Sequence, residues 1–167
     1  MFIPFESLPP HARLWIYQSN RKVTKSEIDT ISDTLMAFTE QWLVHGQPMM
    51  ASYTVRYDQF LVLAADEGFN AASGCSIDGS VRTIRALGEK LAIDFFDRTT
   101  VAFKMEEEIV TVPIAVLKQK NAEGIWDENT LSFNNLVATK SEFEQKWIVS
   151  AGDTWLKRYL PVNNMVK

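Results

Sequence analysis

The sequence predicts an α+β fold of the ferredoxin-like type, an antiparallel sheet that carries its helices on one face. Three observations predict it. Two amphipathic helical patterns flank a pair of adjoining strand patterns, one further strand pattern precedes the first helix, and another follows the second. The order β-α-β-β-α-β, complete by about residue 104, is that of the split β-α-β arrangement, and we expect its first and third strands to be central and parallel. A doubly wound α/β sheet is the alternative.

The first strand is predicted over 13–19, a run rich in β-branched and aromatic residues that follows two prolines. The first helix opens with the capping-box pattern of 24–27, Thr-Lys-Ser-Glu, in which the threonine and the glutamate each satisfy a free helix N–H. The apolar residues that follow recur at steps of three and four and form one stripe: Ile28, Ile31, Leu35, Phe38 and Trp42. We expect this helix to close at His45-Gly46.

Two strands are predicted over 50–57 and 59–65, joined around Asp58. The first alternates between apolar and polar residues, which suits a strand with one wetter face. The second is apolar on both faces and should lie in the middle of a sheet. The short link at Asp58 favours a hairpin over a crossover, and therefore favours the ferredoxin-like order over the doubly wound sheet.

The rest of the chain is predicted as shorter elements. A loop over 66–78 leads into a second helix, whose apolar face carries Val81, Ile84, Leu87 and Leu91. Strands follow over 100–104 and 108–112, then a short helix after Pro113, a strand over 130–133 and two short terminal helices. The tetrapeptide 139–142 repeats the sequence of 24–27, which we interpret as two independent capping boxes. We expect the C-terminal residues, with Trp126, Trp147 and Trp155, to cover the open face of the sheet.

Length and composition set the class of protein. The 167 residues, 46% hydrophobic, fit a single domain (1–167), with a core over about 12–112 and a C-terminal α/β extension over about 113–167. The net charge of −4 argues against binding to nucleic acid or to anionic lipid. One cysteine excludes a disulfide framework and a Cys-rich metal site, and no cofactor is indicated. With no signal segment and no apolar run long enough to span a membrane, we expect a cytoplasmic protein.

The loop and helix N-terminus over 66–80 are the best candidate for a site, and their most informative stretch is 70–80, Asn-Ala-Ala-Ser-Gly-Cys-Ser-Ile-Asp-Gly-Ser. It lies between a buried strand and a helix N-terminus, where free N–H groups and the helix dipole favour a phosphate or carboxylate. The candidate ligand-binding residues are Ser73, Gly74, Cys75, Ser76, Asp78, Ser80 and Arg82. In the alternative interpretation, Ser76 or Asp78 caps the helix and the glycines make the turn.

Cys75 is also the one candidate for a catalytic residue. A thiol beside a helix N-terminus can act as a nucleophile, and a small thiol-dependent enzyme is the alternative function. Such an enzyme needs a base, and only His11 and His45 are available; their distance from Cys75 is not set by the sequence. Arg82 stands one position too late for the phosphatase pattern of Cys, five residues and Arg. A lone cysteine is otherwise most often a small buried hydrophobe.

Other chemistries have less support. Aromatic residues on the predicted strands suggest RNA binding as a function, but the Lys/Arg-Gly-Phe-type motif is missing. Packing in the core is the better explanation of these aromatic residues. A zinc site would depend on carboxylates such as Asp66 and Glu67, without a ligand pattern that marks one. We interpret 106–108 as a solvated hairpin tip.

Four segments of the chain, IPFESLP, RLWIYQSNR, SGCSIDGSV and LSFNNLV, are similar to a family of small bacterial soluble proteins that usually carry the label "ABC transporter ATPase". The resemblance runs from the first residues to WLKRYL near the end, and it brings no catalytic residues with it. The chain has no Gly-x4-Gly-Lys-Ser/Thr loop, so we do not expect ATPase activity. We expect a binding or interaction module, whose partner is a small anionic ligand or a protein; a homodimer is left open.

Overall fold

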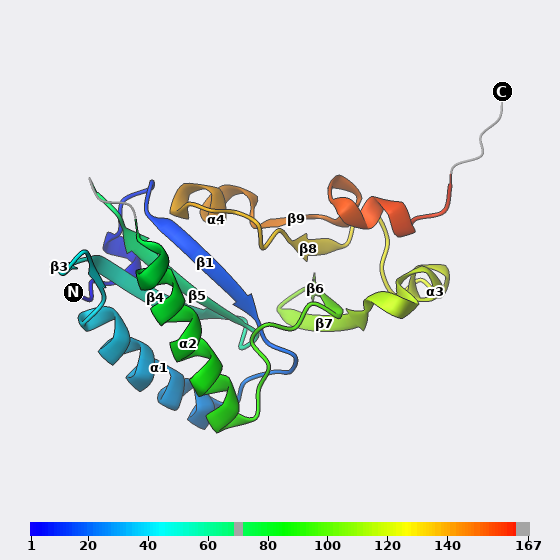
Figure 1. Ribbon diagram of the computed structural model, residues 1–167. Coiled ribbons are helices and arrows are strands. Elements are labelled where there is room, and N and C mark those ends of the chain that lie inside the picture. The colour runs from blue at the N-terminus through cyan, green and yellow to red at the C-terminus, as the bar shows by residue number, and fades with distance from the viewer. Residues whose placement is uncertain (69–71, 163–167) are drawn as a thin grey trace. The chain divides into compact units, whose positions relative to one another are not determined.

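The computed structural model describes residues 1–68 and 72–162 and has an α+β fold (Figure 1). Contacts divide the chain into two compact units. The first unit comprises Met1–Asp97 with Asn135–Gln145, and the second comprises Arg98–Asn134 with Lys146–Lys167. This division differs from the expected border between a core and an extension near residue 112, because the strands after residue 98 belong to the second unit. That the chain is a single domain stays a prediction.

The first unit is built on a three-stranded sheet with the order β1-β5-β4. Its elements are β1 (Arg13–Gln18), α1 (Lys25–Glu40), β4 (Met50–Arg56), β5 (Phe60–Asp66) and α2 (Gly74–Leu91). Because β5 runs antiparallel to both neighbours, β1 and β4 run in the same direction with β5 between them. This is a split β-α-β unit, and its all-apolar strand β5 is central, as the sequence predicts.

The complete ferredoxin-like sheet is not confirmed. The first and third predicted strands, β1 and β5, are neighbours and antiparallel, with Tyr17 opposite Leu61, and only β5 is central while β1 lies at the edge of the sheet. The fourth predicted strand, β6 (Thr100–Met105), pairs along its length with β7 (Glu108–Pro113) in a separate sheet. The free edge of β1 is partly occupied instead by the segment at Ala138, whose carbonyl accepts from the Leu14 N–H at 2.9 Å. Every pairing between described strands is antiparallel, so the doubly wound alternative is wrong.

The first helix begins as predicted but ends earlier. Thr24 and Glu27 form the capping box, while the C-cap is Gln41. The expected closing residues, His45-Gly46, instead make the turn of a small hairpin between β2 (Leu43–Val44) and β3 (Gln47–Pro48). Both turn residues have positive φ, 50° and 76°, which matches the twist of a two-residue hairpin. Apolar residues continue at helical spacing as far as Trp42, so the pattern predicts a longer helix than the one that forms.

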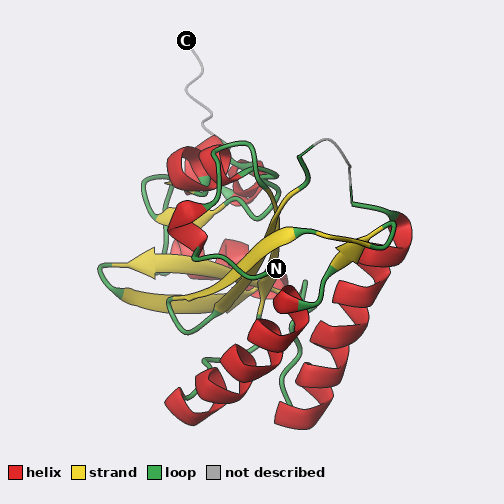
Figure 2. Ribbon diagram, turned by 90° about the vertical axis from the view of Figure 1, so that its left-hand side faces the viewer, coloured by secondary structure: helices red, strands yellow, loops and turns green. Residues whose placement is uncertain are grey.

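Both helices pack on one face of the first unit's sheet, side by side (Figures 1 and 2). The core between the helices and the sheet contains side chains from β1, α1, β5, α2 and the segment after α2: Tyr17, Ile31, Leu35, Leu61, Leu63, Ile84, Leu87 and Phe95. On the opposite face, Arg56 of β4 lies over the rings of Phe5 and Phe143, at 5.5 and 5.4 Å. These rings come from η1 (Phe5–Ser7) and α4 (Lys140–Lys146), so the cover comes from both ends of the chain.

The second unit has a four-stranded antiparallel sheet with the order β7-β6-β8-β9. The remaining elements of this unit are η2 (Ile114–Val116), α3 (Leu117–Ala122), β8 (Leu131–Phe133), β9 (Ile148–Ser150), η3 (Ala151–Asp153) and η4 (Trp155–Tyr159). Trp126 stacks on Phe103 at 5.2 Å and donates its indole N–H to the Leu117 carbonyl at 2.8 Å. Trp126 therefore belongs to this unit's own core, while Trp155 is exposed.

The second capping box forms in part. The N–H of Glu142 donates to the hydroxyl of Thr139 at 3.2 Å, but the Glu142 carboxylate accepts from the N–H of Ala138, the residue before the cap, at 3.3 Å. No helix in the described part of the chain is long and apolar enough to cross a membrane.

Candidate functional site

The predicted site falls on the first turns of α2. The helix begins at Gly74, and its N-cap is Ser73, whose hydroxyl accepts from the Ser76 N–H at 3.1 Å. The capping residue is therefore neither Ser76 nor Asp78, as the alternative interpretation had it. Residues 69–71, which the sequence places in the same loop, lie outside the described residues.

The serine hydroxyls of this turn are engaged within the protein. Ser76 is buried and donates to the Leu43 carbonyl at 2.7 Å, which anchors the β2–β3 hairpin to α2. Ser80 is also buried and donates to the Ile77 carbonyl at 2.6 Å. Burial raises the pKa of Tyr17, and its hydrogen bond with Ser80 opposes that shift. These hydroxyls hold helix and hairpin together and leave fewer donors for a ligand.

Carboxylates lie at the same end of the sheet. Glu67 accepts from the Ala72 N–H at 2.6 Å and lies 3.6 Å from the Arg13 guanidinium. Asp66 lies 3.3 Å from Nε2 of His11. Asp78 on α2 is exposed, as are Gly74 and Arg82. The negative charges of Glu67 and Asp66 oppose the attraction that a helix N-terminus exerts on an anion.

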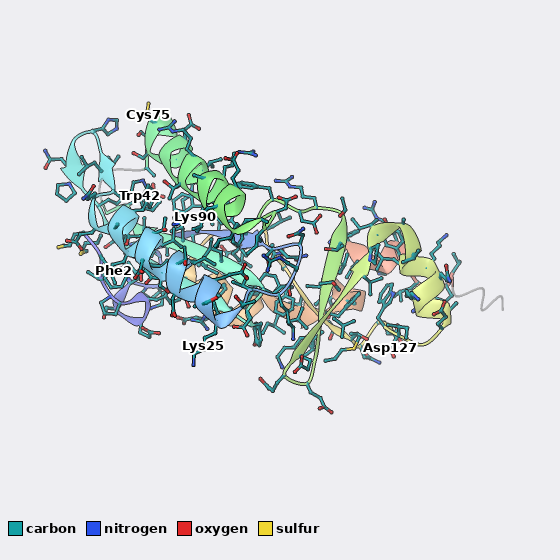
Figure 3. All side chains as sticks on the ribbon, turned by 90° about the horizontal axis from the view of Figure 1, so that it is seen from below. Phe2, Lys25, Trp42, Cys75, Lys90 and Asp127 are labelled. Atoms are coloured by element: carbon teal, nitrogen blue, oxygen red, sulfur yellow. The ribbon has the colours of Figure 1, made fainter. Side chains whose placement is uncertain are left out.

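Cys75 is the second residue of α2, is exposed, and points away from the protein at the helix end (Figure 3). It is not the small buried hydrophobe that is usual for a lone cysteine. Within the described residues, no hydrogen bond joins it to His11 or His45. His45 lies at the turn of the hairpin that Ser76 anchors, so the fold brings this segment to the same helix end. The structure thus gives Cys75 exposure without a bonded base.

Metal binding finds no support in the described residues, among which no group of three or more His, Cys, Asp and Glu side chains is placed to hold an ion. An open hollow of about 400 Å³ lies at the other end of α2, where the Arg85 guanidinium stacks over the Phe96 ring at 4.4 Å. At its rim the Asp94 N–H donates to Oδ1 of Asn20, and the Asn20 N–H donates to the Asp94 carbonyl, both at 2.9 Å. These groups are therefore already bonded within the protein.

Sequence reasoning missed a surface at the end of the first unit where α1 stops. Four residues with exposed apolar side chains stand on or next to segments that meet there, and we call them the methionine surface: Met1, Met36, Leu43 and Met50, at 46%, 40%, 47% and 37% exposed. Backbone hydrogen bonds bring their segments together. The Met1 ammonium donates to the carbonyls of Thr39 (3.1 Å) and Met49 (2.8 Å), and the Met49 N–H donates to the Trp42 carbonyl (3.1 Å).

Acidic residues border this surface along α1. Asp29, Asp33 and Glu40 are exposed and fall with Met36 at steps of four, three and four, so they share one face of the helix. No Lys or Arg occurs in 1–12 or 26–55, the segments that build this end of the unit. A signal was therefore present in the sequence: these stretches contain four methionines and five acidic residues but no Lys or Arg.

Comparison of the chain with protein-family models, curated proteins and solved structures gives no match. The resemblance to the small bacterial family therefore stays a prediction, and the function must be argued from the geometry of the chain itself.

Proposed function

We propose that this chain is a protein-interaction module and that the methionine surface carries the contact. The observation behind the proposal is that Met1, Met36, Leu43 and Met50 are exposed and stand on or next to segments that hydrogen bonds join at one end of the first unit. Single exposed apolar residues are ordinary on a protein surface, but a group of them marks an interaction site. Methionine is flexible and polarizable, which suits a surface that must adapt to a partner.

The support for this surface is rigid, which lowers the entropy lost on binding. Met36 stands on α1, a helix of 16 residues that is capped at its start and packed against the sheet. The segment that carries Met1 pairs with β4 through the Ala51 N–H, which donates to the Met1 carbonyl at 2.9 Å. Flexible side chains on a fixed backbone can fit a partner without folding a loop.

The loop expected to bind a small anion has less support as a site. The hydroxyls of Ser76 and Ser80 are bonded to backbone carbonyls, and Glu67 holds the N–H of Ala72. The thiol-dependent alternative has no base bonded to Cys75 in the described part of the chain. Anion binding and thiol chemistry at 66–80 therefore stay predictions without a favouring contact, and the protein partner is the stronger proposal.

Photocrosslinking tests the proposal. A benzoylphenylalanine at position 36 and a matched one at position 125 would be exposed to an extract of the cells that make the protein. Ile125 is a suitable control because it is an apolar residue of the second unit, with 44% exposure against 40% for Met36. We expect a discrete adduct from position 36 and none from position 125.

The captured partner is then purified and titrated against variants. Met36→Glu should weaken its binding at least about tenfold, or about 1.4 kcal/mol, because a carboxylate would be buried in an apolar contact. Ile125→Glu should leave the affinity unchanged. Equal binding to wild type and Met36→Glu, or adducts only at position 125, would overturn the proposal.

A further inference from the structure

The methionine surface can be modified chemically, because Met1, Met36 and Met50 expose thioether side chains to solvent. We infer that Met36 and Met50 are oxidation sites. A peroxide converts them to sulfoxides while the chain stays folded, and the polar sulfoxides weaken the contact that this surface makes. The effect on the contact rests on the proposed function, whereas the oxidation itself does not.

Exposure divides the methionines of the described residues into two groups. Met36 and Met50 are 40% and 37% exposed, whereas Met49 is 2% exposed and Met105 packs, partly buried, against the core of the second unit. A methionine is oxidised where the oxidant can reach its sulfur, so burial protects it. Peroxide therefore has access to the methionine surface before it reaches the buried methionines.

Met49 and Met50 allow an internal comparison, since they are adjacent in the chain and differ in exposure. Met50 begins β4, and successive side chains of an extended segment point to opposite faces. Met49 packs in a buried cluster with Trp42 and Val44. Its N–H donates to the Trp42 carbonyl at 3.1 Å, and its carbonyl accepts from the Met1 ammonium at 2.8 Å. A difference in their oxidation rates would therefore report the fold and not the local sequence.

Oxidation at the exposed positions is compatible with the fold. Met36 stands on α1, whose buried residues are Ile31, Leu35 and Thr39, so an oxygen added to Met36 can stay in water. The same addition at Met49 would bring a polar atom into an apolar cluster, which costs free energy. Modification of the surface can therefore occur without unfolding and can be reversed.

The reaction is a two-electron transfer of oxygen. The sulfur lone pair of Met36 or Met50 attacks one oxygen of hydrogen peroxide, and the O–O bond breaks. The proton of the transferred hydroxyl passes to the departing oxygen, which leaves as water. Sulfur is thus oxidised and peroxide is reduced by the same electron pair. A methionine sulfoxide reductase reverses the change, since two thiols become a disulfide and the oxygen leaves as water.

Peptide mass spectrometry after peroxide treatment tests the oxidation. The full chain carries C75S, which removes an exposed thiol that would compete for the oxidant. We expect Met36 and Met50 to react at least about tenfold faster than Met49. In urea, where the chain is unfolded, Met49 and Met50 should react at equal rates. Equal rates in the folded chain would overturn the inference, as would loss of the circular dichroism of the fold once Met36 and Met50 are oxidised.

Photocrosslinking from position 43 tests the effect on the contact, because Leu43 belongs to the methionine surface and its replacement leaves the methionines in place. The C75S chain with benzoylphenylalanine at 43 is exposed to a cell extract before and after peroxide treatment. Gel filtration first frees the extract of the small reductants that would restore methionine. We expect oxidation to reduce the adduct at least about tenfold. The adduct should persist in M36L/M50L, which keeps the apolar bulk without a sulfur.

The outcomes separate this inference from the proposed function. An adduct that survives oxidation of Met36 and Met50 overturns the inference and leaves the proposed function standing. Equal loss of the adduct in M36L/M50L assigns the effect to another residue and overturns the inference as well. No adduct from the untreated chain, at position 36 or 43, overturns the proposed function and the effect on the contact with it. The oxidation rates then still decide whether Met36 and Met50 are oxidation sites.

Discussion

Arg21 and Glu27 form a two-pronged ion pair that joins the ends of two helices. Nη1 of Arg21 donates to Oε1 of Glu27 at 2.9 Å, and Nη2 donates to Oε2 at 2.8 Å. The same Nη2 donates to the carbonyl of Leu91, the last residue of α2, at 2.9 Å. Since Glu27 also completes the capping box of α1, this pair fixes the start of α1 against the end of α2.

The ion pair gives stability a defined pH dependence. The Arg21 guanidinium and the Thr24 N–H lower the pKa of Glu27 from 4.5 to about 2. A carboxyl whose pKa is lower in the folded state stabilises the fold above the unfolded value and loses that effect as pH falls toward the folded value. We expect Glu27→Gln to cost about 1 kcal/mol at pH 7 and almost nothing at pH 2.

Urea unfolding of both proteins between pH 2 and pH 7 measures this difference. The difference in free energy of unfolding between wild type and Glu27→Gln should become smaller mainly between pH 4.5 and pH 2. A gap that stays constant across this range would show that the carboxylate charge contributes nothing. Glu144→Gln, which alters an exposed glutamate 3.8 Å from Lys140, serves as the control. Its difference in free energy of unfolding from wild type should change less over the same pH range.

The end of α2 requires a glycine that the helical pattern does not reveal. A Cβ on Gly88 would lie 2.5 Å from the backbone oxygen of Ile93, whose N–H donates to the Gly88 carbonyl at 2.9 Å. Gly88→Ala should therefore destabilise the protein by about 2 kcal/mol. Ala92 is left-handed, with φ 56° and ψ 46°, so Ala92→Gly should be neutral or stabilising by up to about 1 kcal/mol. Thermal melts of the two variants should shift in opposite directions, or Ala92→Gly not at all.

Lys140 ties the N-terminal segment to α4. Its buried ammonium donates to the carbonyls of Glu6 (2.9 Å) and Leu8 (2.7 Å). Lys140→Met would keep the length of the side chain but leave both carbonyls without a donor, at a cost of about 1–3 kcal/mol. Lys118→Met changes an exposed lysine and should cost little. Chemical unfolding compares them, and equal stability of the two variants would refute the anchoring role.

Local patterns predicted the elements of the fold better than their pairing. The capping box at Thr24, the helix start after Thr139, the apolar centre strand β5 and the hairpin at Asp58 follow from short-range chemistry, and each is present. The place of β6 does not follow from them, because a buried apolar strand can join any sheet. Its choice depends on β8 and on the segment at Ala138, which are more than 25 residues away.

The site was harder to predict for a related reason. The run around Cys75 has the composition of a ligand loop, but its serines are used to anchor Leu43 and to cap the helix. That use depends on a hairpin more than 30 residues earlier in the chain. Met1 lies at the end of α1 because its ammonium is bonded to the Thr39 carbonyl, and no local period encodes this return of the N-terminal segment.

Ser52 tests whether every buried polar group in the first unit's core has a hydrogen-bond partner. It is fully buried on β4, and its hydroxyl has no hydrogen-bond partner among the described residues. A buried hydroxyl without a partner loses its bonds to water and gains none, so Ser52→Ala should be neutral or stabilising by up to about 1 kcal/mol. Ser19 is equally buried, but its hydroxyl has two acceptors within reach for its single proton, the carbonyls of Arg21 (2.6 Å) and Gln59 (2.9 Å). Ser19→Ala should therefore destabilise the protein by about 1–2 kcal/mol.

Urea unfolding of this matched pair isolates the effect of the hydrogen bonds, because the same atom is removed at two sites of equal burial. A loss of stability in Ser52→Ala as large as in Ser19→Ala would mean that the Ser52 hydroxyl is bonded in solution.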